Sequence, residues 1–383
     1  TIAVPATLIE IVRRAKPDEV AQAYSTGRYT FGDSALPFFW LGALLQAGGR
    51  SQEVATRSMH VVVVKSAQQR IALHVDEVMG NQEVVVKNLG AQLARVPGLA
   101  GITLLASGAY LFGVALLYGA YGTVSLALLA PLLRQQAPPA AALAALLMVA
   151  ALLLKSALFP LHFWLPPAHG GAPAPVSALL SALVIKASFY LLVRLWFFLF
   201  LPLASPAAAQ LLGALGAAAV LWGSLMALRQ SRLKMLVAYS TVAQVGYLFL
   251  LFPLATHSDP GAAHSALQGA FMQALAHGMA KAAMFAAAGA MIVAAGRDEI
   301  AQLGGIAQRL PLTLFAFGLA GVTLMGLPPS AGFVAKWLLI DAAIAAGPWG
   351  WGAVLVAGGL LSAACVFKVL RPAFVAAAAA APL

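Results

Sequence analysis

Four lysines lie inside long apolar stretches of this sequence, where a charged side chain is costly. They are Lys155, Lys186, Lys281 and Lys336. A lysine at the centre of a bilayer opposes insertion by about 2.5 to 3.5 kcal/mol, and ionisable residues in membrane helices commonly mark ion or proton pathways. An amine inside a membrane helix can gain and lose a proton. The pattern of four such lysines therefore predicts proton transfer across a membrane.

The structural alternative is snorkelling, in which the long side chain carries its charge to the membrane surface. This alternative fits Arg194, which lies near the end of its apolar stretch. It fits Lys186 and Lys281 less well, because they follow Pro175 and His264 by about eleven and seventeen residues. We therefore favour a polar path for the lysines as a group.

Prolines beside the first and the last of these lysines predict broken helices. They are Pro160 and Pro166 for the first, and Pro328 and Pro329 for the last. Proline removes a backbone donor and interrupts a helix. Broken helices at membrane depth are tolerated where they line a cavity, and their free ends commonly surround ion sites. Two broken helices with one lysine each favour a transport path.

Two histidines are candidate relay residues. His277 precedes Lys281 by four residues, which places both on one helix face. An imidazole can pass a proton at physiological pH, although a hydrogen-bonded core histidine is an equally good interpretation. His162 borders the proline-rich loop, as does His169, and both are expected near the interface. No spacing suggests a metal site, a nucleotide-binding loop or a catalytic triad.

Composition divides the chain near residue 100. The 383 residues are 62% hydrophobic and 9% charged, against about 25% charged residues in ordinary soluble domains. Residues 1–100 hold 10 Lys+Arg and 8 Asp+Glu, whereas residues 101–383 hold 13 and 4. The net charge is +11, but the basic residues form no basic face and no recognisable nucleic-acid module. Nucleic-acid binding is therefore not expected. The single Cys365 permits no internal disulfide.

Eight apolar stretches are long enough to span a bilayer. If each stretch crosses once, the loops between them alternate between the two sides of the membrane. One side then receives seven basic residues and the other only Arg134. The positive-inside rule makes the basic side cytoplasmic, with the N-terminal part on the same side. The stretches are 101–120, 139–161, 175–200, 207–228, 235–253, 265–295, 311–345 and 350–370. The seven basic residues are Arg229, Arg232, Lys234, Arg297, Arg309, Lys368 and Arg371.

The first 100 residues predict a small β domain. His60–Val64, Arg70–Val78 and Glu83–Val86 are candidate strands, with Gly80-Asn81 as a turn. Upstream segments around Leu8–Arg14 and Val20–Tyr24 are compatible with helix.

Ordered motifs from about Ala109 to Arg371 resemble the antiporter-type membrane subunits of complex I (NADH:quinone oxidoreductase). Mrp-type cation/proton antiporters and membrane-bound hydrogenases have similar subunits. The motifs include Phe-Pro-Leu-His-Phe-Trp-Leu-Pro at 159–166, Ala-His-Gly-Met-Ala-Lys at 276–281 and Gly-Leu-Pro-Pro-Ser-Ala-Gly-Phe-Val-Ala-Lys at 326–336. Others lie at 110–119, 171–180 and 233–247.

This resemblance implies a role for each lysine. Lys155 matches the lysine of the family's first broken helix, Lys186 that of the following helix, and Lys281 a central lysine. Lys336 matches the lysine or glutamate of the second broken helix. Family members have about fourteen helices, and this chain is expected to begin at the sixth. The fifth helix, whose glutamate pairs with the first lysine, is then missing.

Residues 1 to about 105 resemble the CheW-like domain of chemotaxis-type histidine kinases, through the run Ala72–Gly90 and residues 94–101. Such domains are SH3-like β-barrels that bind proteins and catalyse nothing. The expected domains are a truncated CheW-like domain at 1–105, a truncated transmembrane domain at 106–373 and an alanine-rich tail at 374–383. We interpret the chain as a chimera of two fragments.

The sequence therefore predicts a mainly α polytopic membrane protein. It has about eight transmembrane helices, two of them broken by proline, after a small truncated SH3-like β-barrel domain. The predicted function is proton or cation/proton translocation in a bacterial inner membrane. Expected partners are other membrane subunits, with Na+ as the alternative ion. The chain itself binds no cofactor, whereas a complex I-like parent uses NADH and quinone. The rival interpretation is a membrane-anchored signalling adaptor that binds a chemoreceptor or histidine kinase.

Overall fold

The computed structural model describes residues 9–32, 34–41, 58–66, 69–75, 99–256, 259–347 and 349–375. It divides into two compact units, Thr1–Asn88 and Leu89–Leu383. The predicted strand Glu83–Val86, the turn before it and the alanine-rich end from residue 376 lie outside the described residues.

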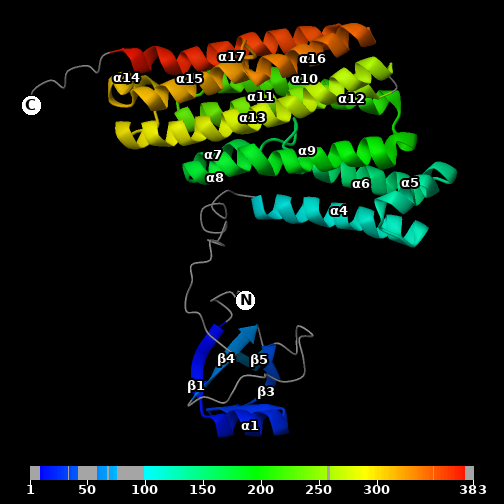
Figure 1. The fold of residues 1–383 in the computed structure, drawn as a ribbon, viewed down its shortest axis with the longest axis vertical. Coiled ribbons are helices and arrows are strands. Elements are labelled where there is room, and N and C mark those ends of the chain that lie inside the picture. Colours follow the sequence, from blue (N-terminus) through cyan, green and yellow to red (C-terminus); the bar gives the residue numbers. More distant parts are fainter. Residues whose placement is uncertain are drawn as a thin grey trace, which may run out of the picture. The chain divides into compact units, whose positions relative to one another are not determined.

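Among its described residues, the first unit holds a five-stranded sheet and the helix α1 (Figure 1). Strand β3 pairs with β5 in parallel, and the other pairs are antiparallel. Helix α1 (Pro17–Thr26) has proline in its first turn, where no N–H is needed, and ends at Gly27 with φ 67°. The sheet order is β1-β4-β5-β3-β2, formed by β1 (Ile9–Ala15), β2 (Arg28–Phe31), β3 (Ser34–Trp40), β4 (Met59–Ser66) and β5 (Gln69–Val75).

The predicted β character of this unit is confirmed, with one local correction. Strands β4 and β5 cover the predicted segments as far as Val75. The segment Leu8–Arg14, thought compatible with helix, instead lies mostly in β1 and pairs with β4. Its Ile and Val residues are β-branched and suit a sheet, and this pairing overrides local helix propensity.

Phe38 is the aromatic centre of the first unit. Its ring lies 5.1 Å from that of Tyr24 and 6.2 Å from that of Tyr29, between ring centroids. Phe38 is 5% exposed, whereas Phe39, on the opposite face of the same strand, is 43% exposed. The alternation of side chains along a strand explains this difference.

We expect Phe38→Ala to destabilise the first unit by about 3 to 5 kcal/mol, because it leaves a cavity in the core. Phe39→Ala should cost less than about 1 kcal/mol, because surface substitutions usually do. Amide hydrogen exchange of β4 and β5 in the full chain measures both. Equal loss of protection in the two variants would contradict this packing.

The second unit is a bundle of helices. Among its described residues, six helices are long and apolar enough to cross a membrane. They are Thr103–Tyr121 within α4 (Leu99–Tyr121), Ala174–Leu203, α10 (Pro206–Arg229), Leu233–Ala255, α13 (Pro260–Ala295) and α17 (Gly350–Phe374). The second of these runs through α8 (Ala174–Leu179), η2 (Leu180–Val184), α9 (Ile185–Arg194), η3 (Leu195–Phe200) and η4 (Leu201–Leu203). The fourth joins α11 (Leu233–Phe249) and α12 (Leu251–Ala255).

The two remaining predicted crossings are each made of two shorter helices. Helix α6 (Pro139–Lys155) ends earlier than expected, and α7 (Leu165–Gly171) follows a break at 156–164. Helices α15 (Pro311–Met325) and α16 (Ala331–Ala346) are separated by residues 326–330. Both α15 and α16 pack along the long helix α13, so they are successive halves of one crossing (Figure 1). The predicted polytopic fold with two broken helices is therefore confirmed. Short helices α5 (Leu126–Gln135), η5 (Ile300–Gln302) and α14 (Ile306–Arg309) connect the crossings.

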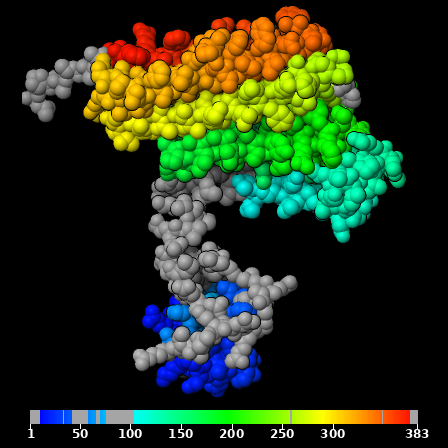
Figure 2. Space-filling view, in the orientation of Figure 1, coloured from blue at the N-terminus to red at the C-terminus, as the bar shows by residue number. Residues whose placement is uncertain are grey.

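Helix α13 lies between the elements that carry two of the other lysines. In Figure 2 its atoms, coloured yellow-green to yellow, separate the green segment that includes α8 from the orange α16. Lys186 lies in α9, Lys281 in α13 and Lys336 in α16. The fold therefore orders three of the four lysines across the bundle.

Glycines bring α10 and α11 into backbone contact. A Cβ on Gly216 would lie 2.7 Å from the Gly246 carbonyl oxygen, and one on Gly246 would lie 2.4 Å from that of Gly216. Gly223 similarly faces the backbone of Ala243. Small residues at such positions are the usual means of close packing between membrane helices. This packing helps to bury α11 at the centre of the bundle.

Candidate functional site

Helix α11 carries a stripe of buried polar side chains. Ser240, Thr241, Gln244 and Tyr247 follow one another at spacings that place them on one side of the helix. All four are less than 9% exposed, and Thr241 and Tyr247 are fully buried. The sequence interpretation missed this stripe, although polar residues at helical spacing within an apolar span are themselves a signal of function.

Lys281 is fully buried and faces the first part of this stripe. Its Nζ donates to the Val237 carbonyl oxygen at 2.8 Å and to the Ser240 hydroxyl. Ser240 in turn donates to the Val237 carbonyl oxygen at 2.9 Å. No carboxylate pairs with Lys281 among the described residues. A buried amine with neutral partners can exist with or without its extra proton.

Lys336 is held by the end of a broken helix. Its Nζ donates to the carbonyl oxygens of Leu324 and Met325, at 2.8 and 2.9 Å. These carbonyls are in the last turn of α15, where helical partners are missing and the helix dipole is negative. The ammonium also lies 4.7 Å from the centre of the Tyr247 ring, a cation–π contact.

Gly326 makes room for this cation site. It has φ 80°, and a Cβ there would lie 2.6 Å from Cδ of Lys336. Pro328 and Pro329 follow it and prevent α15 from continuing. The break therefore exposes the two carbonyl oxygens that bind Lys336.

Gln244 connects this site to neighbouring helices. Its Nε2 donates to the Leu324 carbonyl oxygen and to the Ser362 hydroxyl, both at 3.1 Å. The Gln273 amide donates to Gln244 Oε1 at 2.8 Å. Leu324 therefore accepts hydrogen bonds from both Gln244 and Lys336. This network links α11, α13, α15, α16 and α17 at one level of the bundle.

Lys186 is the second residue of α9, which follows the π-helical segment η2. Its Nζ donates to the Ser181 carbonyl oxygen within that segment. Single π-helical turns often occur at functional sites. The Ser181 hydroxyl lies 3.2 Å from the Thr241 hydroxyl, which joins this element to the polar stripe of α11.

Two histidines are buried near these lysines. His277 lies within electrostatic range of Lys186 and Lys281, one helical turn before the latter. His169 lies within range of Lys186, Lys281 and Lys234. Neither ring nitrogen of either histidine has a hydrogen-bond partner among the described residues. Both imidazoles are therefore buried with unpaired ring nitrogens in this part of the structure.

His169 lies inside the bundle and not on its surface. It is fully buried, and its ring stacks on Phe285 at a centroid distance of 4.6 Å. The reason is that α7 packs against α11, so its residues face the bundle. Pro166 lies in the first turn of α7, where it starts the helix after the break.

Lys155 and His162 make no hydrogen bond or ion pair with the other predicted residues in the described ranges. Lys155 is the last residue of α6, is half-buried and has no hydrogen bond or ion pair in the part of the chain described. His162 and Pro160 lie in the break, and the His162 ring stacks on Phe159 at 5.4 Å. No contact of these residues with the other three lysines is seen in the described ranges.

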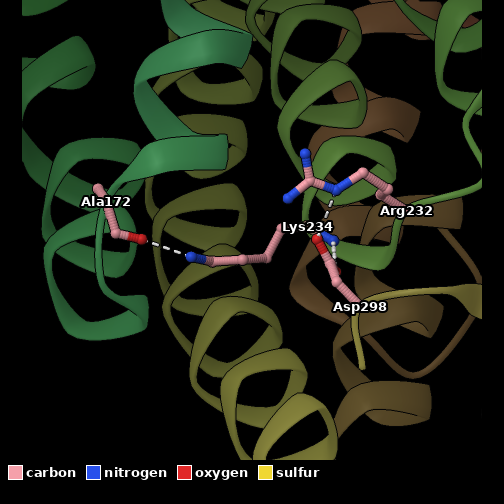
Figure 3. Close-up of polar contacts among 4 residues, drawn as sticks. All are labelled: Ala172, Arg232, Lys234 and Asp298. Atoms are coloured by element: carbon pink, nitrogen blue, oxygen red, sulfur yellow. Dashed lines mark hydrogen bonds and ion pairs between the residues drawn. The ribbon is translucent and has the colours of Figure 1, made fainter. Parts of the chain in front are cut away.

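Basic residues gather at the end of the bundle where α10 and α13 finish and α11 begins. Asp298 accepts from Arg232 Nε at 3.0 Å and from the Lys234 backbone N–H at 3.1 Å (Figure 3). The Lys234 ammonium reaches the Ala172 carbonyl oxygen instead. Lys368 donates to the carbonyl oxygens of Leu228 and Gln230, at 2.5 and 2.7 Å.

Residues 99–362 match the transmembrane family model of NADH:quinone oxidoreductase and Mrp antiporters. The chain belongs to this NADH:quinone oxidoreductase/Mrp antiporter family. The chain is therefore a multipass membrane protein. Residues 1–117 match the model of the CheW-like domain, so the chain joins segments that resemble two different families.

Similar proteins within the antiporter family include NADH-quinone oxidoreductase subunit N of Desulforudis audaxviator. It is 40% identical over 268 residues, which are 69% of this chain and 52% of that protein. A chain of the Mrp complex from Dietzia sp. DQ12-45-1b has a TM-score of 0.66 and 32% identity, covering 75% of this chain and 52% of that one. A chain of respiratory complex I from Thermus thermophilus has a TM-score of 0.59 and 30% identity, covering 77% of this chain and 62% of that one. The chain thus spans about half the length of the curated relative.

Proposed function

We propose that residues 99–374 form part of a proton-translocating membrane subunit. The observation that carries this proposal is the buried pair Lys281 and Lys336, both held by neutral oxygen atoms and joined by the polar stripe of α11. Ser240, which contacts Lys281, and Tyr247, which faces Lys336, are seven residues apart. That spacing is about 10 Å along a helix axis, which is two steps for a proton relayed through side chains and water.

In this proposal Lys186 and His277 deliver the proton to Lys281, and Lys336 passes it towards the other end. When Lys336 carries its proton, the carbonyl end of α15 and the Tyr247 ring contact the ammonium in place of a fixed carboxylate. Gln244 keeps the Leu324 carbonyl oxygen in place. The relay works because no ion pair among the described residues holds the charge of these lysines in place.

Lys155 requires a carboxylate from outside the described residues. The one acidic residue of α16, Asp341, is exposed and accepts a hydrogen bond from Ser265 at 3.2 Å. We propose that Lys155, together with His162, functions when further membrane helices supply the acid. Partners would be other membrane subunits of a complex that uses NADH and quinone, or of an antiporter that exchanges Na+.

The proposal is tested by completing the subunit with the additional helices of a close relative. Reconstituted with its partner subunits, the completed subunit should acidify vesicles when the partners are driven. A signalling adaptor that uses the helices as a tether would produce no proton uptake. A tether also needs one span, whereas this chain buries charged side chains in several.

We propose a bacterial inner membrane location, with the basic end and the CheW-like segment in the cytoplasm. Cysteines placed at Arg229 or Ser231 should be protected from an impermeant thiol reagent added outside intact cells. A cysteine at Gln136, in the loop after α5 at the other end, should be labelled readily. The reverse pattern would overturn this orientation. Cys365 is buried, so background labelling should be low.

A further inference from the structure

Lys234 connects the beginning of α11 to the end of α7. Its ammonium donates to the carbonyl oxygen of Ala172, the C-terminal capping residue of α7. Cations near helix C-termini are stabilised by the dipole and by unpaired carbonyls. Figure 3 shows the side chain extended towards Ala172 and away from Asp298. Lys234 is therefore used as a bridge between two helices.

Asp298 fixes the base of this bridge. Its carboxylate accepts from the Arg232 guanidinium and from the backbone N–H of Lys234, which lies in the first turn of α11 and has no partner within the helix. The main chain adds two bonds, from Leu233 N to the Asp298 carbonyl oxygen and from Ile300 N to that of Ser231, both at 2.8 Å. The backbone of Lys234 is thus held firmly, whereas its ammonium has one protein acceptor among the described residues.

His169 lies on α7, the helix that Ala172 caps. It is three residues before Ala172 on α7, is fully buried and lies within electrostatic range of Lys234. Next to it, Gly170 rests on α11, because a Cβ there would lie 2.9 Å from Sδ of Met235. The end of α7 is therefore closed on α11, and the Lys234 side chain spans the same gap.

We propose that Lys234 is a positioning residue that closes the basic end of the proton path over His169. Release of the ammonium from Ala172 lets α7 separate from α11 and admits water to His169. The path then connects His169 to Lys186 and Lys281, which are within its electrostatic range. This inference rests on the proposed function for the identity of the path, but the closure itself is a property of the fold.

Cysteine accessibility tests the closure without any transport. The His169→Cys variant is made in a Cys365→Ala background and treated in open membranes with a small charged methanethiosulfonate reagent. With Lys234 present, the introduced thiol should react slowly. With Lys234→Ala added, labelling should be at least tenfold faster. With Lys234→Arg, protection should remain, because a guanidinium also donates to the carbonyl.

Lys368→Ala is the matched control. Lys368 is also a half-buried lysine at this end that donates to helix-end carbonyls, but its acceptors are on α10 and beyond. It should leave the labelling rate unchanged. The inference is overturned if Lys234→Ala has no effect, or if Lys368→Ala raises the rate equally. Because labelling needs no transport, that result overturns the closure alone, whereas absent proton uptake by the completed subunit overturns the proposed function alone.

Discussion

Replacing Lys281 by methionine is expected to reduce proton uptake by the completed subunit about 100-fold or more, the usual scale for losing a positioned proton-transfer group. Folding should not suffer. Deleting a buried charge removes an insertion cost of about 2.5 to 3.5 kcal/mol, and Ser240 keeps its hydrogen bond to the Val237 carbonyl oxygen. Proton uptake into vesicles measures the loss of transport, and the amount of inserted protein measures folding.

Lys281→Arg distinguishes proton exchange from mere positive charge. A guanidinium stays protonated in proteins, so this variant should also be inactive. Lys368→Met, at the end of the bundle, is the control and should retain most of the uptake. Full activity of Lys281→Arg would show that a fixed charge is sufficient, and would remove Lys281 from the path.

Gly216→Leu is expected to prevent correct packing of the second unit. The added side chain would meet the backbone of Gly246 and Phe249 on α11, where no rotamer change can relieve the clash. We expect destabilisation of more than about 3 kcal/mol, at the upper end for overpacked sites. Gly318→Leu in α15 is the matched control, because nothing lies within 4 Å of its added Cβ.

Thermal unfolding and limited proteolysis in detergent should separate these two variants. The Gly216 variant should be cleaved within α10 and α11 under conditions where the Gly318 variant is resistant. Similar resistance of both would mean that α10 and α11 tolerate separation. The central position of α11, and with it the polar stripe, would then need another explanation.

The broken helices could be predicted because proline acts locally. Pro160, Pro328 and Pro329 deprive their helices of donors wherever they lie, and breaks occur at 156–164 and 326–330. The burial of Lys281 was also predictable, since it lies far from either end of its apolar stretch. Hydrophobicity and local chemistry determine these features, and both can be read from the chain directly.

The partners of the lysines could not be predicted. Lys336 binds the backbone carbonyls of Leu324 and Met325. Every residue has a backbone carbonyl, so the sequence does not mark these two, and they become available only because α15 ends there. Ser240 and Gln244 are ordinary polar residues until tertiary packing places α11 at the centre. The burial of His169 could not be predicted for the same reason, since it depends on α7 packing against a helix some 60 residues later.

The most direct test of the account is proton uptake by the completed subunit with Lys155, Lys186, Lys281 and Lys336 all replaced by alanine. The variant is compared with the unmodified subunit in vesicles of equal protein content, with a pH-sensitive dye and the same driven partners. We predict normal insertion and assembly with no uptake above that of empty vesicles. Uptake at the unmodified rate would contradict the proton path and leave snorkelling as the explanation of the buried lysines.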